Sequence, residues 1–292
     1  MKRIAIYGES IDEKHYDFIR RFFLLLDKYE FEYIIHKKYR DKLETIVQIS
    51  TEVKVFSHSE ELINNSIECL ISIGGDGTML NSFQYLLNTD ILVFGFNTGR
   101  LGFLSNVTTE QSEWALEELA NDRYESEDRS VLEISHHSNP VAYYAFNEVT
   151  IHKQDTSSML TIHTMIDNDF VNSYWADGVI VSTPTGSTAY SLSCGGPILM
   201  PKSNNFMITP IAPHNLNVRP IVFSDEKAIK LRVESRSGNF LLAMDSISVA
   251  LSTDQEIHVK KAAFSLQLLK FSDYNYFNTL RSKLMWGADK RN

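Results

Sequence analysis

A short apolar run that ends in glycines around one acid is the feature that most constrains this fold. The run covers residues 69–73, and it is followed by Gly74, Gly75, Asp76, Gly77 and Thr78. A short, β-branched apolar run is typical of a buried strand. Glycine has no Cβ, so the backbone here can bring its N–H groups close to an anion. The stretch therefore predicts a strand whose end carries a phosphate-binding loop.

Asp76 is the unusual member of this loop. Residues 79–87 have helical spacing, so the N–H groups of the loop would lie at a helix N-terminus. A loop that only held phosphate would not need a negative charge. Asp76 is therefore expected to handle a metal or a hydroxyl group, or to act as a general base. The alternative is that Asp76 only caps the helix. A cap needs one glycine at most, and the loop has three in four residues.

Residues 1–126 alternate strand-like and helix-like segments, which predicts a parallel sheet with crossover helices. A second apolar run, residues 91–96, leads into a second glycine-bearing loop at 97–104. Ligands of such sheets bind beyond the carboxyl ends of the strands, so both loops should border one crevice. Arg100 could meet a phosphate there and Phe103 could stack on a base. The alternatives are a solvated loop cation and a core side chain, and Phe103 on its own favours the core.

The second half of the chain has a different sequence pattern. From about residue 129 it consists of short β-rich segments separated by turn residues, which predicts a β-sandwich. These segments are residues 131–135, 142–152, 160–166, 179–181, 206–211, 221–223, 229–233, 241–251, 257–260 and 264–269. One amphipathic helix near residues 274–284 is expected to return to the first domain. The predicted domains are therefore 1–126 with 272–292, an α/β nucleotide-binding domain, and 127–271, a β-sandwich domain.

Composition limits the partners and the compartment. The chain is 43% hydrophobic and 22% charged, as soluble globular proteins are. Its net charge of −9 argues against nucleic acid as a partner, because phosphate neutralisation needs a basic face. The two cysteines lie far apart in sequence, which predicts neither a disulfide nor a zinc site and favours a reducing cytoplasm. The apolar runs are too short to span a bilayer, so no membrane partner is expected.

Two further groups of polar residues lie in the β-rich half. The stronger one is residues 177–197, where a strand leads into a Pro/Gly turn rich in hydroxyls and then into a short helical piece that stops at Gly195 and Gly196. Such a loop can hold a base, a ribose or a pyrophosphate, and the alternative is a Ser/Thr-rich surface loop. The second is the pair Asn147 and Glu148 inside an apolar run. A carboxylate there must be paired or face a cleft, or else it lies on an edge strand facing water.

These motifs together resemble the NAD kinase family. The resemblance rests on residues 74–78, 97–104, 147–148 and 177–197, and it extends to residues 212–216, 219–220 and 277–281. It thus follows the whole chain in order. The glycine loop alone is weakly specific, because diacylglycerol-type lipid kinases and phosphofructokinases have similar loops. The loop that begins at Asp177 is the discriminating motif.

The resemblance implies an enzyme that phosphorylates the 2′-hydroxyl of the adenosine ribose of NAD, with ATP and Mg²⁺, as a homodimer or homotetramer in the cytoplasm. It makes residues 127–271 the NAD-binding domain, and it leaves open whether polyphosphate can replace ATP as donor. The protein itself is expected to supply no dedicated metal site. Asp76 would be catalytic. The family match assigns roles to His214 and Arg219 less firmly, and either residue could be structural. The residues expected to bind substrates are Gly74, Gly75, Gly77, Thr78, Arg100, Phe103, Asn147, Glu148, Asp177, Thr185, Thr188, Ala189, Tyr190, Ser193 and Ala212.

Two other functions remain open from the residues alone. One is a lipid kinase that shares the glycine loop, and the other is a nucleotide sensor that binds NAD without turnover. One departure from the family pattern also matters, because the family often has Asp-Gly-Gln where this chain has Asp245, Ser246 and Ile247. The contribution of that turn, to subunit packing or to the rim of the pocket, is therefore in question.

Overall fold

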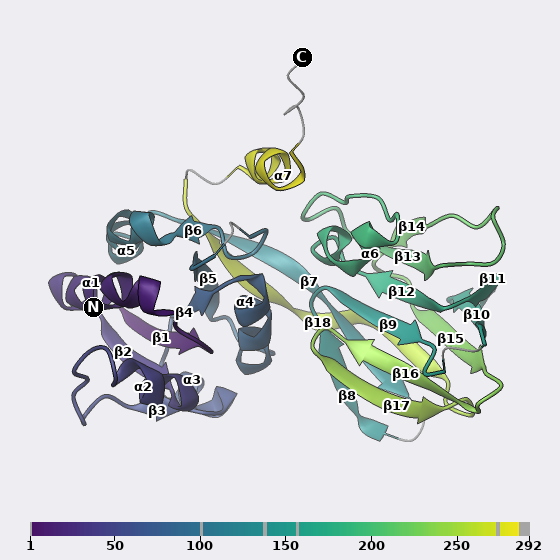
Figure 1. Ribbon diagram of the computed structural model, residues 1–292, viewed down its shortest axis with the longest axis horizontal. Coiled ribbons are helices and arrows are strands. Elements are labelled where there is room, and N and C mark those ends of the chain that lie inside the picture. The colour runs from purple at the N-terminus through teal and green to yellow at the C-terminus, as the bar shows by residue number, and fades with distance from the viewer. Residues whose placement is uncertain (1, 100–101, 137–138, 156–157, 273–274, 286–292) are drawn as a thin grey trace, which may run out of the picture. The chain divides into compact units, whose positions relative to one another are not determined.

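The computed structural model describes residues 2–99, 102–136, 139–155, 158–272 and 275–285, which are arranged in two compact units (Figure 1). The first unit comprises Met1–Asp128 and Leu266–Asn292, and the second comprises Arg129–Ser265. Two long strands, β7 (Glu125–His136) and β18 (Ile257–Lys270), each begin in one unit and end in the other. The chain therefore leaves the first unit once and returns to it near its end.

The first unit is built on a parallel sheet, as its alternating pattern predicts. Its strands lie in the order β3, β2, β1, β4, β5, and the end of β18 pairs with β5 in parallel. Each strand is short and nearly continuously apolar, as expected for strands covered on both faces. The strands are β1 (Arg3–Gly8), β2 (Glu32–His36), β3 (Val55–Phe56), β4 (Cys69–Gly74), β5 (Leu92–Asn97) and β6 (Val107–Thr108).

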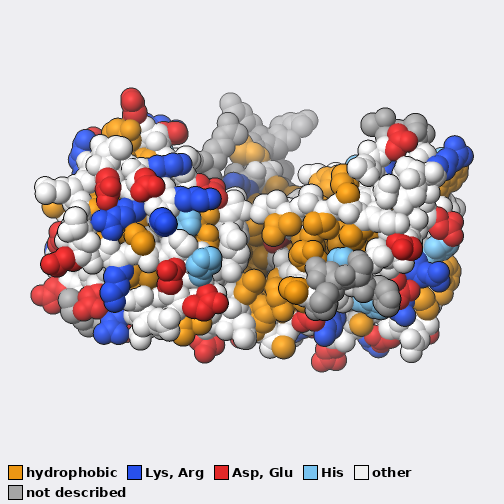
Figure 2. All heavy atoms as spheres, turned by 90° about the horizontal axis from the view of Figure 1, so that it is seen from below, with side chains coloured by type: hydrophobic (Ala, Val, Ile, Leu, Met, Phe, Trp, Pro, Cys, Tyr) orange, Lys and Arg blue, Asp and Glu red, His pale blue; other side chains and the backbone are white. Residues whose placement is uncertain are grey.

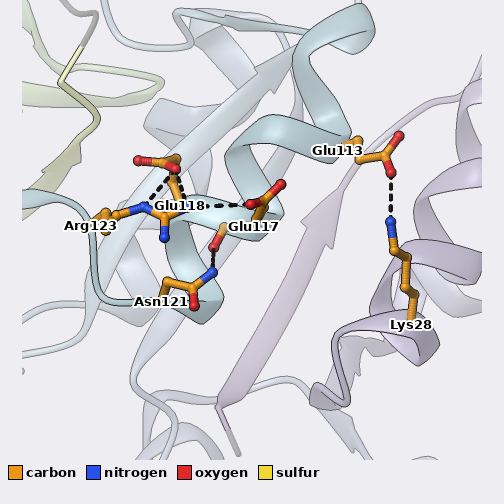
Figure 3. A network of polar contacts seen from close by, with 6 residues as sticks. All are labelled: Lys28, Glu113, Glu117, Glu118, Asn121 and Arg123. Carbon is orange, nitrogen blue, oxygen red and sulfur yellow. Dashed lines mark hydrogen bonds and ion pairs between the residues drawn. The ribbon is translucent and has the colours of Figure 1, made fainter.

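Helices flank this sheet. They are α1 (Tyr16–Lys28), α2 (Lys37–Leu43), α3 (Ser59–Asn64), α4 (Asp76–Ser82), α5 (Ser112–Ala120) and α7 (Tyr276–Leu284), with short 3₁₀ turns at Glu13–His15, Phe83–Tyr85 and Thr109–Gln111. Helices α1 and α5 are neighbours, joined at the surface by a 2.7 Å ion pair from Lys28 to Glu113 (Figure 3). At the far end of α5, Arg123 pairs with Glu118 at 2.6 Å.

The strand order fixes where a ligand can bind in the first unit. From β1 the chain moves outward to β2 and β3, and then returns to place β4 on the other side of β1. Loops on opposite sides of such a switch point leave a crevice between them at the carboxyl ends of the strands. Gly8 ends β1 beside Ile73, one residue before Gly74 at the end of β4. The glycine loop therefore lies at the expected ligand-binding edge of the sheet.

The end of the chain completes the core of the first unit. That core includes buried aromatic residues of α1 and β5, and Leu269 and Phe271 belong to it as well. The ring centroid of Phe271 lies 5.2 Å from that of Phe94 and 5.1 Å from that of Trp114. Residues near the end of the chain thus stabilise a unit that begins at its start.

The second unit is a sandwich of antiparallel sheets, which confirms the predicted fold class. One sheet has the order β14, β13, β12, β9, β16, β17, and the other contains β11, β10, β15 and the first part of β18, together with β7 and β8. Between them lies a core of alternating inward side chains, among them Phe206 and Phe240. The strands are β8 (Asn139–Ala145), β9 (Glu148–His152), β10 (Leu160–Ile166), β11 (Asp169–Ala176), β12 (Gly178–Ser182), β13 (Asn205–Ile211), β14 (Ile221–Ser224), β15 (Ile229–Glu234), β16 (Asn239–Met244) and β17 (Ile247–Ser252).

Three segment predictions differ from the structure. The run 142–152 is two strands, because the backbone N–H groups of Phe146 and Asn147 bond to the Asp245 carboxylate rather than to a neighbouring strand. The run 241–251 is a hairpin with a turn at Asp245 and Ser246. Residues 257–269 form one continuous strand instead of two. Strand β11 was not predicted at all, because its sequence mixes exposed polar and apolar residues.

No helix among the described residues is both long enough and apolar enough to cross a membrane. On the face drawn in Figure 2, the surface of the first unit carries acidic and basic side chains next to one another. Such mixed charge gives a solvated surface without a strong field of one sign.

Candidate active site

The glycine loop of the first unit leads directly into helix α4. Gly75 occupies the N-cap position, and Asp76 is the first residue of the helix. The interpretation of Asp76 as a simple helix cap is therefore wrong. Thr78, one turn into the helix, is half-buried, and Gly77 is exposed.

The Asp76 carboxylate connects the two glycine-bearing loops. Its Oδ2 accepts a hydrogen bond from the backbone N–H of Phe103 at 2.8 Å, and its Oδ1 accepts from Leu104 at 3.1 Å and Ser105 at 2.9 Å. A carboxylate has about four acceptor positions, and the described residues occupy three of them. Asp76 thus orients the second loop, and the described part of the chain supplies no donor to its fourth position.

The glycines of the two loops meet different steric demands. A Cβ on Gly74 would lie 2.4 Å from Thr78 Oγ1, and a Cβ on Gly102 would lie 1.7 Å from Asp76 Oδ1. These two glycines are required by close packing of the protein itself. A Cβ on Gly75 or Gly77 would meet nothing within 4 Å. Glycine at those two positions leaves an open surface where a ligand can approach the backbone.

Two more predicted residues of the first unit belong to the second loop. Phe103 is half-buried, and Lys283 Nζ of helix α7 lies 6.0 Å from the centroid of its ring. Phe103 is therefore not a fully buried core side chain, and Lys283 lies over its ring. Arg100 lies outside the described residues.

In the second unit the segment 146–148 is held on both sides of its backbone. The Asp245 carboxylate accepts hydrogen bonds from the N–H groups of Phe146, Asn147 and Glu148 at 2.6, 3.0 and 3.1 Å. On the opposite side, the Thr183 N–H donates to the Asn147 carbonyl at 2.9 Å and the Thr183 hydroxyl donates to that of Phe146 at 2.7 Å. The Asn147–Glu148 pair is therefore fixed in position before any ligand binds.

Glu148 has an unusual electrostatic environment. Burial, and next the nearby charge of Asp245, raise the pKa of its carboxyl to about 8, although the Tyr190 backbone N–H bonds to it. Its Oε2 atom is buried without a hydrogen-bond partner among the described residues. An unpaired buried carboxyl oxygen is costly.

The hydroxyl-rich loop is buried for most of its length, which contradicts its interpretation as a surface loop. It contains a 3₁₀ turn (Gly186–Thr188) and a short helix, α6 (Tyr190–Ser193). Ser187 bonds the Pro184 carbonyl at 2.6 Å, and Ser191 lies 2.7 Å from the Thr209 hydroxyl. A Cβ on Gly186 would lie 2.1 Å from the Asn147 carbonyl oxygen. The buried hydroxyls and this glycine hold the loop against the Asn147 segment.

The predicted residues of this loop divide into an inner and an outer set. Thr185 is buried, and its Oγ1 accepts a hydrogen bond from Arg129 at 3.0 Å, so its role inside the protein is to hold the loop. Thr188 and Ala189 are half-buried, whereas Tyr190 and Ser193 are exposed. The outer set is available to a ligand.

Asp177 and Ala212 lie beside this loop. The Asp177 N–H donates to the Ile211 carbonyl at 3.0 Å, and the Asp177 carboxylate forms a 2.6 Å ion pair with Lys153. Burial raises the pKa of Tyr190 most, the neighbouring Cys194 thiol comes next, and the charges of Asp177 and Glu148 contribute least. The Tyr190 backbone N–H bonds to the Glu148 carboxyl, so these two residues are neighbours. Ala212 is exposed and has a positive φ of 43°.

Asp245 and Gly102 hold the site segments in place, and the sequence patterns did not indicate this structural role for either residue. Both act through contacts with backbone or side chains far away in the sequence. The sequence signal for Asp245 is the comparison with the family pattern Asp-Gly-Gln. This chain keeps the aspartate and replaces the two residues after it.

Comparisons with known proteins agree with this architecture. A family model described as the ATP-NAD kinase N-terminal domain matches residues 19–124, and one described as the ATP-NAD kinase C-terminal domain matches residues 146–271. The NAD kinase of Christiangramia forsetii is 43% identical over 296 residues, covering 99% of this chain and 100% of that protein.

Two solved structures are also similar. The NAD kinase from Archaeoglobus fulgidus in complex with ATP is 27% identical, with a TM-score of 0.76 over 97% of this chain and 98% of that one. Yeast NADH kinase complexed with NADH is 22% identical and has the same fold, with a TM-score of 0.88 over 99% of this chain and 89% of that one.

A parallel sheet with a glycine loop at its carboxyl edge, followed by an antiparallel sandwich, defines the class of two-domain nucleotide kinases. The family models of both domains match this chain in order and over most of its length. They narrow the class to a single family. The chain belongs to the ATP-NAD kinase family. The predicted resemblance is confirmed, and the comparisons do not support the lipid kinase alternative.

Proposed function

We propose that this protein transfers the terminal phosphoryl group of ATP to the 2′-hydroxyl of the adenosine ribose of NAD, giving NADP. The observation that carries the proposal is the Asp76 carboxylate, which orients the second loop through three N–H groups and has a fourth acceptor position that no described residue fills. Membership of the family supports NAD as the acceptor.

Asp76 would act on the attacking hydroxyl. Its remaining lone pair would accept the hydrogen bond of the 2′-hydroxyl and take its proton as the oxygen bonds to phosphorus. The bond from that phosphorus to the bridging oxygen of ATP breaks, and ADP leaves. Phosphoryl transfer depends mainly on positioning and charge stabilisation. The three N–H donors keep the carboxylate still while it performs this step.

The open glycines would receive the phosphates. Gly75 and Gly77 leave room for phosphate oxygens close to the N–H groups at the start of α4. Gly74 and Thr78 shape the loop from within. The Phe103 face would stack near the adenine, and Arg100 is proposed as a phosphate contact on sequence grounds alone.

The second unit would bind the dinucleotide. Asn147 and Glu148 would bond to the adenosine and ribose groups, because their backbone is held firmly and Glu148 Oε2 lacks a partner among the described residues. Thr188, Ala189, Tyr190 and Ser193 would line the pocket around them. Asp177 would lie toward the nicotinamide end, with Ala212 beside it.

Mg²⁺ would enter with the donor. The described residues contain no group of three or more metal-ligating side chains that could hold an ion. Mg²⁺ is usually bound through substrate phosphates with few protein ligands, and this chemistry fits ATP as its carrier. The ion would supply neutralisation of the phosphate charge. A homodimer or homotetramer in the cytoplasm and the use of polyphosphate as donor are further parts of the proposal.

The test is NADP formation by the purified protein. The protein is given NAD and Mg²⁺ with either ATP or polyphosphate, and NADP is measured with an NADP-specific dehydrogenase. Asp76→Asn should lower kcat by about 10²–10⁴-fold, in the range of lost general-base catalysis, with NAD binding retained. The control is Asp90→Asn, an exposed acid that precedes β5 at the opposite edge of the sheet. Binding of NAD without turnover by the wild type would contradict the proposal and favour a sensor.

A further inference from the structure

Asp245 occupies the turn of a tight hairpin in the second unit. Strands β16 and β17 pair up to Met244 and Ile247, which leaves only Asp245 and Ser246 to make the turn. Asp245 has a positive φ of 49°. Asparagine, aspartate and glycine all tolerate this conformation. The turn geometry alone therefore does not require a carboxylate.

The carboxylate is explained by what it bonds to. Its Oδ2 accepts from the Phe146 N–H at 2.6 Å, and its Oδ1 accepts from Asn147 at 3.0 Å and Glu148 at 3.1 Å. The Asp245 N–H in turn donates to the Glu148 carbonyl at 3.2 Å. The hairpin turn thus binds three successive residues that lie nearly a hundred positions earlier in the chain.

The same device occurs in the first unit. Asp76 also receives three successive backbone N–H groups, from Phe103, Leu104 and Ser105. In both cases the carboxylate satisfies N–H groups that no strand ladder takes up. Residues 103–105 lie between β5 and β6, and residues 146–148 lead into β9, which begins at Glu148. In both cases the held segment carries residues that we assign to substrate binding.

We propose that Asp245 is a positioning residue for NAD: it holds the Asn147–Glu148 segment in the geometry that binds the adenosine ribose. This inference rests on the proposed function. Asp245 acts through the backbone of that segment and touches no reacting atom. It also keeps the Glu148 carboxyl beside a second acid, with Oε2 of Glu148 buried and without a hydrogen-bond partner among the described residues.

Two substitutions separate the turn from the clamp. Asp245→Gly keeps the backbone freedom that φ requires and removes the carboxylate. Asp245→Asn keeps one oxygen for two N–H groups and presents an amide N–H₂ to the third. The matched control is Asp167, which has a φ of 54° in the β10–β11 turn and accepts from the Ala228 N–H at 3.1 Å. Asp167→Gly removes a carboxylate, which also pairs with Lys227, from a turn to which we assign no ligand.

The expected result is a selective loss of NAD recognition. Asp245→Gly should raise the KM and the calorimetric Kd for NAD by about 100-fold, the scale of an ångström-sized misplacement. The KM for ATP should stay at the wild-type value. Asp245→Asn should fall between the wild type and Asp245→Gly, and Asp167→Gly should match the wild type. Paired with Glu148→Gln, Asp245→Gly should be less than additive, because both act on one contact.

Three outcomes would overturn the inference. The first is an equal effect of Asp245→Gly and Asp167→Gly on the KM and Kd for NAD. The second is an equal rise in the KM values for ATP and NAD in Asp245→Gly. The third is full additivity of Asp245→Gly with Glu148→Gln. If circular dichroism shows that Asp245→Gly is unfolded, the same comparisons are made with Asp245→Asn instead. A wild type that binds NAD but makes no NADP refutes the proposed reaction, while the binding data still judge Asp245. A wild type that does not bind NAD refutes both.

Discussion

Two aspartates, Asp76 and Asp245, show how a single carboxylate can serve as a structural clamp. Asp76 and Asp245 each take up three backbone N–H groups that no sheet or helix satisfies. Hydrogen bonds to a charged acceptor are stronger than neutral ones. Each clamp therefore holds a loop with little local secondary structure.

Glu148 gives a pH dependence at the residue scale. Its pKa rises from an ordinary value of 4.5 to about 8, through burial and the charge of Asp245. An acid whose pKa is raised by folding binds its proton more tightly in the folded state. Its ionisation therefore destabilises the fold. Its contribution to the free energy of unfolding is therefore complete below pH 4.5 and is lost as the pH rises toward 8.

We expect Glu148→Gln to flatten this fall in stability. Urea unfolding at pH values from 5 to 9 would measure it. The Gln variant should lose less stability than the wild type over this range. Some slope should remain, because burial also raises the pKa of Asp245. Tyr190 and Cys194, the other titrating groups near Glu148, have raised pKa values and ionise at higher pH. Identical slopes in the two proteins would contradict the assignment.

At the scale of elements, the two glycine-bearing loops form one structure because Gly102 packs on Asp76. A Cβ on Gly102 would overlap the carboxylate, at 1.7 Å from Oδ1. Gly102→Ala should therefore displace Asp76 and cost about 1–3 kcal/mol of stability, as overpacking does. Activity should fall with it. Thermal unfolding and NADP formation, measured on one preparation, would check both effects, and an active, fully stable variant would refute the clamp.

Gly77 should behave in the opposite way. It lies in the first turn of α4, and a Cβ at this position would have nothing within 4 Å, so alanine fits and favours the helix by about 0.5–1 kcal/mol. The same methyl group would occupy the approach of a phosphate. We expect Gly77→Ala to be at least as stable as the wild type, with a KM for ATP about tenfold higher or more, from similar overpacking of the ligand. An unchanged KM would show that phosphate does not approach here.

At the scale of the whole molecule, the first unit depends on residues from both ends of the chain. The last part of β18 adds a parallel strand beside β5, and Phe271 fills the core between Phe94 and Trp114. The first unit therefore cannot be complete until the second has been synthesised.

Phe271→Ala should destabilise the first unit by about 3–5 kcal/mol, the cost of truncating a buried aromatic residue. Phe277→Ala is the matched control, because Phe277 is 52% exposed on α7; it should change stability by about 0.5 kcal/mol or less. Denaturant unfolding followed by tryptophan fluorescence would compare them, with Trp114 as a probe next to Phe271. Equal effects would show that the end of the chain contributes little to this core.

Much of this architecture could be predicted because its signals are local. A buried strand followed by glycines identifies the loop at Gly74, since backbone conformation and hydrophobic period are properties of neighbouring residues. The change from alternating segments to short β-rich ones predicts the two fold types for the same reason. The family resemblance rests on such local motifs, which is why it could be stated from the sequence and then be confirmed.

The partners of Asp76 and Asp245 were decided by the tertiary structure alone. Asp76 bonds to a loop 27 residues later, and Asp245 bonds to Asn147 across 98 residues. No local period or propensity encodes such a distance, because only the folded sheets bring the segments together. The sequence by itself determined where the glycine loop, the hydroxyl-rich loop and the sheets would form. Folding decided which carboxylates hold those loops in place, since a backbone N–H selects its acceptor by proximity in space.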